Sequence, residues 1–198
     1  MKRIIKAAMG CIMLLAISCS KQPLGIPQSV NTQTNDNANS ASMNTAHYIG
    51  ERFGGGVIFW ITKDSLHGLI ADTVDLGSYA WWNGIYTNAG ATATRIGSRK
   101  ANTRKIIVSQ GRAGYYAALY SAKSKHSGYT DWFLPSKDEL NEIYKNKAII
   151  GGSFFLSGYW SSSESNENQA WGQRFDDGYQ YFDLDKHYAS HVRAIRAF

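Results

Sequence analysis

The chain has 198 residues, of which 43% are hydrophobic and 13% aromatic, and Lys and Arg outnumber Asp and Glu by 21 to 15. This composition is typical of a globular protein and excludes collagen-like and highly charged disordered chains. The formal net charge of +6 would favour a nucleic-acid partner if its cations lay on the folded part, so their distribution along the chain decides that question.

Residues 1–18 are predicted to form a secretory signal peptide. Lys2, Arg3 and Lys6 precede an apolar run that ends in small residues, the layout of such a signal. The run is shorter than the roughly 20 residues that span a bilayer. Cleavage after residue 18 would remove these three cations and half of the net charge, so we expect no nucleic-acid partner.

The signal ends in Leu-Ala-Ile-Ser-Cys at positions 15–19, which resembles the lipobox of bacterial lipoproteins. The resemblance implies that Cys19 carries a diacylglyceryl lipid with acyl chains such as palmitate and becomes the mature N-terminus. An ordinary secretory signal cleaved nearby is the alternative. Cys19 would be the one cysteine of the mature chain, because the other of the two lies in the signal, so no internal disulfide is expected.

Two further regions follow the signal. Residues 19–46 are rich in Ser, Asn, Gln and Thr and cannot bury enough apolar surface to fold, which predicts a flexible linker. Residues 47–198 are rich in glycine and aromatic residues and have the length of one domain. A lipid on Cys19 would therefore tether a single folded domain to a membrane.

The domain begins with a predicted hairpin. Residues 56–62 and 66–71 are β-branched, aromatic or aliphatic segments separated by a polar turn. Residues 101–123 are compatible with a helix but are interrupted at Gly111 and Gly114, which indicates one kinked helix or two short ones.

A second helix has a clearer start. Ser136 lies three residues before Glu139, the pattern of a capping box. Leu140, Ile143, Tyr144 and Lys147 follow at helical spacing until Gly151 and Gly152. From Tyr159 onward, short extended segments alternate with polar or glycine turns. The whole pattern predicts an α+β fold.

Four motifs of the domain resemble the Lcl C-terminal domain family, named for a collagen-like bacterial adhesin. They are Gly-Gly-Gly-Val-Ile-Phe at 54–59, Asp-Trp-Phe-Leu-Pro-Ser-Lys-Asp-Glu-Leu at 131–140, Tyr-Trp-Ser-Ser-Ser-Glu at 159–164 and Val-Arg-Ala-Ile-Arg-Ala-Phe at 192–198. The resemblance implies a C-type-lectin-like fold, similar also to formylglycine-generating enzymes: two helical regions on twisted antiparallel strands, with the termini close together.

Most of the motif residues have a structural interpretation. Trp132, Leu134 and Trp160 are large apolar residues next to turn or cap signals, and we assign them to the core. Arg193 and Arg196 could anchor a ligand, but pairing with acids or backbone carbonyls is the favoured role.

From the sequence we predict that the protein is not an enzyme. The formylglycine-generating relatives use cysteines, which the mature domain lacks, and the serines at 161–163 have no Gly-x-Ser-x-Gly context. His187 and His191 have zinc-ligand spacing only on a helix, and their segment is predicted to be a turn and strand. We predict no cofactor, and the alternative is calcium, for which side-chain oxygens are offered by Glu164, Asn166, Asn168, Asp176, Asp177, Asp183 and Asp185.

Residues 179–191 have the composition of a binding surface, because Tyr and His offer rigid faces while Asp and Ser add hydrogen bonds. An ordinary strand pair with partly exposed aromatics is the alternative. Our candidate ligand-binding residues are Tyr179, Tyr181, Phe182, Asp183, Asp185, His187, Tyr188, Ser190, His191, Asn166 and Asn168.

The same segment resembles the variable region of lipoproteins that belong to diversity-generating retroelements, in which randomised template adenines turn AAC codons into NNC codons. Eleven of its thirteen residues can be encoded by NNC, and Gln180 and Lys186 cannot. The count has little weight by itself. The position before the Val-Arg-Ala-Ile-Arg-Ala-Phe ending implies a diversified receptor-binding surface.

A cationic cluster is a second candidate surface, for sulfated glycans or phosphates. Its candidate anion-binding residues are Arg99, Lys100, Arg104 and Lys105, with Arg95 close by. A solvated helix face is the alternative.

Together these features predict a non-catalytic lipoprotein of the bacterial outer membrane, surface-exposed or periplasmic, that binds a protein or glycan on another cell or surface. A calcium-dependent or sulfated-glycan-binding lectin-like adhesin and a structural outer-membrane lipoprotein are the alternatives.

Overall fold

A computed structural model describes residues 45–198 of the protein. The predicted signal peptide, Cys19 and most of the predicted linker lie outside the described residues. The first of two sheets contains β1 (Arg52–Phe53), β2 (Gly56–Ile61), β3 (Gly68–Ala71) and β9 (Ile195–Ala197), in the order β1-β2-β3-β9. All its neighbouring strands are antiparallel, and the predicted hairpin forms β2 and β3.

The second sheet has five strands. They are β4 (Ser78–Ala80), β5 (Gly158–Glu164), β6 (Gln169–Arg174), β7 (Gln180–Asp185) and β8 (Ala189–His191), in the order β4-β8-β5-β6-β7. The prediction of antiparallel strands is wrong for one pair, because β5 and β8 run parallel, with Tyr159 opposite His191. The chain returns to β8 beside β4 and β5, which leaves β7 as an edge strand.

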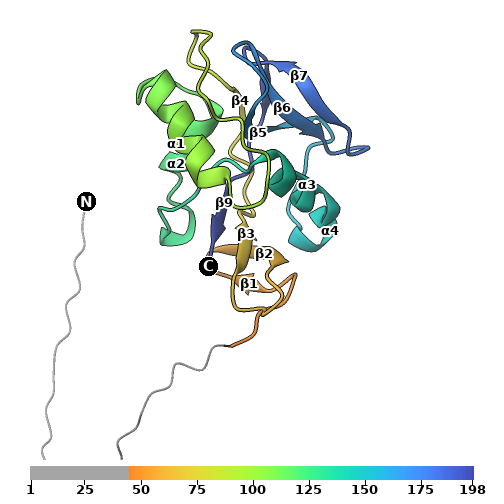
Figure 1. The fold of residues 1–198 in the computed structure, drawn as a ribbon. Coiled ribbons are helices and arrows are strands. Elements are labelled where there is room, and N and C mark those ends of the chain that lie inside the picture. Colours follow the sequence, from red (N-terminus) through yellow and green to blue (C-terminus); the bar gives the residue numbers. More distant parts are fainter. Residues whose placement is uncertain (1–44) are drawn as a thin grey trace, which may run out of the picture. The chain divides into compact units, whose positions relative to one another are not determined.

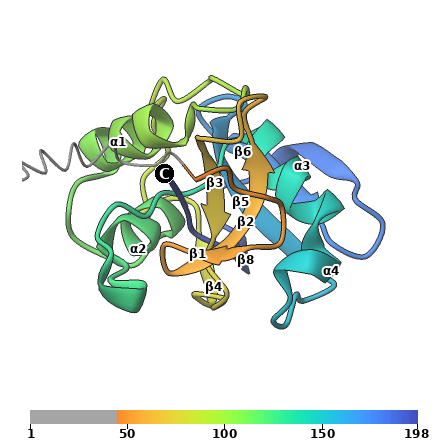
Figure 2. The same cartoon turned by 90° about the horizontal axis from the view of Figure 1, so that it is seen from below.

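The helices form two groups. The first contains α1 (Arg99–Gln110) and α2 (Ala117–Lys123), followed by the short 3-10 helix η1 (His126–Gly128). The second contains α3 (Lys137–Lys145) and α4 (Lys147–Ile150). The two groups lie on opposite sides of the strands (Figures 1 and 2). The predicted α+β class is therefore confirmed, as are its two helical regions.

Local sequence explains where these helices begin and end. α1 stops at Gly111, whose φ of 84° lies in the left-handed region that favours glycine. At the start of α3, the Ser136 hydroxyl accepts a hydrogen bond from the Glu139 amide while the Glu139 carboxylate accepts one from the Ser136 amide. The predicted interruption and the predicted capping box are both confirmed.

The core lies between the sheets and the helices. Trp132, Leu134 and Trp160 are fully buried, as predicted. The two ends of the domain also meet: the rings of His47 and Phe198 are 4.7 Å apart. This confirms that the ends of the domain lie close together, whereas the likeness to C-type lectins stays a prediction.

The two arginines of the last motif have structural partners. Arg193 is buried and donates to the backbone carbonyls of Asp72 and Ser153. Arg196 pairs with the Asp131 carboxylate and donates to the Gly54 carbonyl. Both therefore bind the chain's own acids and carbonyls, as the sequence interpretation favours.

Candidate functional site

An exposed cluster of aromatic and polar side chains lies where the turn between β7 and β8 meets the loop after β4. The Tyr86 hydroxyl donates to the Asp185 carboxylate at 2.7 Å, and His187 Nδ1 lies 2.7 Å from the same oxygen. The ring of Trp82 contacts that of Tyr86 at 4.0 Å, and the ring of His187 contacts that of Tyr188 at 4.1 Å. We call these five residues the aromatic surface.

Hydrogen bonds hold this surface in one arrangement. Partial burial opposes the ionisation of Asp185, but hydrogen bonds from the His187 amide and the Tyr86 hydroxyl outweigh it, so the pKa of Asp185 is lowered. The hydrogen bond to Asp185, followed by burial, raises the pKa of Tyr86. The surface thus presents a neutral phenol and an ionised carboxylate that are already paired.

A buried ion pair lies directly behind the aromatic surface. Lys186 Nζ is 2.6 Å from Glu164 Oε1 and also donates to the carbonyls of Thr87 and Glu167, while both charged side chains are fully buried. Burial lowers the pKa of Lys186, and the nearby Glu164 carboxylate opposes that shift. With three acceptors, the ammonium group is well satisfied despite its burial.

Glu164 extends the same network to the loop after β4. Its carboxylate accepts hydrogen bonds from the amides of Ala89 and Ala91, at 2.8 and 3.2 Å. Lys186 also lies 4.6 Å from the centre of the Trp81 ring. One ion pair therefore fixes three segments that are distant in sequence: the loop after β4, the β5–β6 turn and the β7–β8 turn.

Asn166 and Asn168 lie in the β5–β6 turn and are exposed. The Asn166 side-chain oxygen accepts hydrogen bonds from the amides of Asn168 and Gln169, which shapes the turn. The Asn168 carbonyl accepts from the Lys186 amide at 2.9 Å. The structure therefore brings these two predicted residues next to the turn that carries the aromatic surface.

Four other predicted residues, Tyr179, Tyr181, Phe182 and Asp183, lie on or just before the edge strand β7 and form a separate group. Tyr179 and Phe182 are 53% and 54% exposed. The rings of Tyr179 and Tyr181 are 5.1 Å apart. The predicted binding segment therefore presents two neighbouring exposed groups rather than one continuous row.

Two predicted contact residues do not belong to either group. Ser190 is buried, so its assignment as a ligand contact is wrong. His191 is mostly buried, because its ring stacks on Phe155 at 4.1 Å and its Nδ1 lies 3.1 Å from Asp75 Oδ1. Both residues lie in β8, which pairs with β4 and β5 inside the sheet.

The cationic cluster is also divided by the structure. Arg99 is buried and pairs with Glu139 at 2.9 Å, so the prediction that it binds an external anion is wrong. Lys105 donates to the Gly90 carbonyl, while Lys100 and Arg104 are exposed. The four candidates therefore lie in different environments, and anion binding by Lys100, Arg104 and Lys105 stays a prediction.

The candidate metal ligands are dispersed as well. Within residues 45–198, no group of three or more His, Cys, Asp and Glu side chains is placed to hold a metal ion. Glu164 is occupied by Lys186, and Asp176 and Asp177 both pair with Arg174. Ser161 and Ser163 donate to backbone carbonyls inside the fold.

Trp82 and Tyr86 belong to the aromatic surface but are absent from the predicted site. The signal available in the sequence was the aromatic density around the Asn-Gly pair at 83–84. The contact of Trp82 and Tyr86 with the β7–β8 turn could not be inferred from this signal. The contact depends on the buried Lys186–Glu164 pair, which joins that turn to the loop after β4.

This arrangement defines an α+β domain with an exposed, pre-ordered aromatic surface. The Lcl C-terminal domain model matches residues 61–196, more than half of the chain, and the protein therefore belongs to the Lcl C-terminal domain family. No curated protein matches the chain. Membership in this family indicates a bacterial surface or adhesion type of protein. In residues 45–198, no helix is both long and apolar enough to cross a membrane.

Proposed function

We propose that this protein is a lipid-anchored, non-catalytic binding protein of the bacterial outer membrane, and that it recognises a protein or glycan through the aromatic surface. The observation that carries the proposal is the exposure of Tyr86, His187 and Tyr188 above a fully buried Lys186–Glu164 pair. Exposed large aromatic residues are otherwise costly in water, and aromatic residues are enriched at binding hot spots.

The buried pair supports this function because it limits the entropy lost on binding. Loops that are free before binding must be ordered by the ligand, which weakens the affinity. Here Lys186 and Glu164 already hold the loop after β4 through Thr87 and Ala89, and Lys186 holds the β5–β6 turn through Glu167. The surface resembles a paratope with rigid aromatic anchors and adjustable polar neighbours.

The same arrangement fits a surface diversified by a retroelement. Gln180 and Lys186, the two residues of the segment that an NNC codon cannot encode, both hold the frame: Gln180 donates to the Lys137 carbonyl, and Lys186 is fully buried. Leu184 and Ser190 also face inward although an NNC codon can encode both. The two residues that cannot be diversified are therefore structural, but some residues that can be diversified are structural as well. This mechanism would be excluded if the genome had no reverse transcriptase gene and no near-copy of the 3′ end of this gene close to it.

A test of the binding function uses the purified protein on protein and glycan arrays, with calcium and with a chelator. Any ligand found should lose affinity for Tyr86→Ala and Tyr188→Ala. Tyr48→Ala is the control, because Tyr48 is 65% exposed, more than Tyr86 at 41% and Tyr188 at 54%, and lies outside the aromatic surface. Loss of stability without loss of binding would contradict the proposal and favour a structural lipoprotein. Binding that needs calcium would favour the lectin-like alternative.

The lipid anchor has a separate test. Mass spectrometry of the mature protein should find an acylated Cys19 as its first residue. An unmodified N-terminus near that position would show an ordinary secreted protein, and the proposed attachment to the outer membrane would then be wrong.

A further inference from the structure

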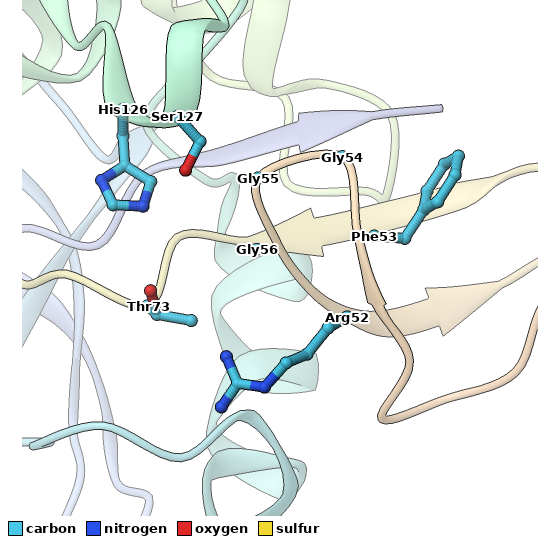
Figure 3. Close-up of a pocket in the computed structure, with 8 residues that line it drawn as sticks. All are labelled: Arg52, Phe53, Gly54, Gly55, Gly56, Thr73, His126 and Ser127. Atoms are coloured by element: carbon cyan, nitrogen blue, oxygen red, sulfur yellow. The ribbon is translucent and has the colours of Figure 1, made fainter. Parts of the chain in front are cut away.

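A small polar pocket lies between the tip of the β1–β2 hairpin and the 3-10 helix η1. Its volume is about 270 Å³. Figure 3 shows the side chains of Arg52, Thr73, His126 and Ser127 around the same space, while the ring of Phe53 is turned away from it. The β1–β2 hairpin belongs to the four-stranded sheet and lies at the end of the domain opposite the loop after β4 (Figure 1). The pocket is therefore distinct from the aromatic surface.

Glycine makes this pocket possible. Gly54 and Gly55 form the two-residue tip of the hairpin, with φ values of 54° and 86° that favour glycine. A Cβ on Gly55 would lie 2.9 Å from the Cβ of Ser127 and 2.8 Å from the ring of Tyr129. The bare backbone thus lets the hairpin and η1 approach each other closely and form two walls of the pocket.

Ser127 has an unusual backbone conformation at the pocket wall. Its φ of 52° lies in the left-handed region, which is unfavourable for a residue with a side chain. The hydroxyl groups of Ser127 and Thr73 form no hydrogen bond within residues 45–198. Two donors are therefore available to a ligand, one of them on a strained residue of the kind found at binding sites.

The charges of the pocket favour a single negative charge. Arg52 is exposed and forms no ion pair within the described part of the chain, whereas the nearby Arg196 is neutralised by Asp131. His126 Nε2 lies 3.7 Å from the buried Asp72 carboxylate, so any positive charge on His126 is already matched. One guanidinium remains for the ligand, which suits a group that carries one negative charge.

We propose that this pocket binds an acidic monosaccharide unit, with its carboxylate on Arg52 and its ring hydroxyls on Thr73, Ser127 and His126. A guanidinium matches a carboxylate with two parallel hydrogen bonds. The volume lies just below the range for drug-sized ligands, so it suits one sugar unit rather than a longer segment. The mostly polar side chains around it suit a ligand with several hydroxyl groups.

The test titrates the purified protein with sodium glucuronate, glucose and N-acetylglycine and follows backbone amide signals by NMR. We expect glucuronate to shift the signals of Gly54, Gly55 and Ser127 at millimolar concentrations, with much weaker effects from the other two compounds. Equal affinity for N-acetylglycine would replace the sugar with a peptide carboxylate and overturn the proposal. No shift at the pocket with glucuronate would also overturn it.

Two variants link the binding to the pocket. Arg52→Gln should weaken glucuronate binding by roughly tenfold or more, since it removes a charge-assisted pair, while Arg95→Gln, at another exposed arginine, should leave it unchanged. Ser127→Gly should weaken binding without loss of stability, because glycine relieves the left-handed strain. Unchanged binding in both pocket variants would contradict the proposal. Tyr86→Ala should not affect glucuronate, so this test fails or succeeds independently of the aromatic surface.

Discussion

The two sheets of the domain are held together in different ways. In the four-stranded sheet, the buried residues of β2 and β3 are almost all apolar, including Val57, Phe59 and Ile70. In the five-stranded sheet, the buried part of β5 continues from Trp160 into the serines at 161–163 and then Glu164. The first sheet is thus stabilised by apolar packing, whereas the second, which we call the polar sheet, combines apolar packing through Trp160 and Ala170 with buried polar bonds.

This difference shows which sheet is suited to carry an exposed binding surface. Apolar packing is non-directional, whereas hydrogen bonds and ion pairs fix the orientation of the loops that they join. The aromatic surface lies above the polar sheet. If the two sheets differ in this way, removing one partner of a buried polar bond should disturb the loops of the aromatic surface. A single substitution in the four-stranded, apolar sheet should disturb them far less.

The largest effect is expected from Lys186→Met. The substitution leaves the Glu164 carboxylate buried without its cation, which should lower the free energy of unfolding by about 3–5 kcal/mol in urea denaturation. The double variant Lys186→Met with Glu164→Gln should recover part of this loss, because a neutral amide is easier to bury. A single variant as stable as the original protein would show that the pair does not support the loops.

The second effect appears at alkaline pH and also tests the polar sheet. Burial and the hydrogen bond to Asp75 raise the pKa of Tyr159 from 10.0 to about 12. The folded state therefore keeps this proton while the unfolded state loses it, and the stabilisation is complete below pH 10 and is lost as the pH rises towards 12. The loss should reach about 3 kcal/mol.

Tyrosine absorbance measured against pH checks this result. Tyr116, whose pKa burial also raises to about 12, should ionise late together with Tyr159, and Tyr159→Phe should remove one late ionisation. Ionisation of every tyrosine near pH 10 while the protein is still folded would contradict the prediction.

A smaller effect is expected in the apolar sheet from Gly55→Ala. The left-handed φ and the close approach of Ser127 should together cost about 1–3 kcal/mol in thermal or urea unfolding. The sugar pocket should be lost, while the NMR signals of His187 and Tyr188 should not move. Changes at these two residues would show that the two sheets are more closely coupled than their contacts indicate.

Much of the fold could be predicted because it follows local rules. The hairpin of β2 and β3, the break at Gly111 and the capping box at Ser136 each depend on neighbouring residues. The parallel pairing of β5 with β8 could not be predicted in this way, since it depends on where the chain returns after β7.

The candidate site was predictable in composition but not in arrangement. Residues 179–191 contain Asp185 and His187, the partners of Tyr86, yet alternation along the segment could not show that Ser190 is buried. Arg99 was misassigned for a similar reason: its partner Glu139 is forty residues away in sequence and meets it only in the fold. Long-range polar pairs leave no periodic signal.

The smallest effect is expected from Tyr86→Phe, which tests whether the aromatic surface is ordered by its own hydrogen bond or by the ion pair beneath it. The change keeps the ring and removes the donor to Asp185, whose pKa should then rise from its lowered value. Because the bond is exposed, the unfolding midpoint should not change measurably. Carboxylate NMR across the acid range can follow Asp185, with Tyr48→Phe as the control. If the loop after β4 became mobile in this variant, Lys186 and Glu164 would not be sufficient to hold it. The proposal that this buried pair keeps the aromatic surface ordered, whatever side chains the surface carries, would then be wrong.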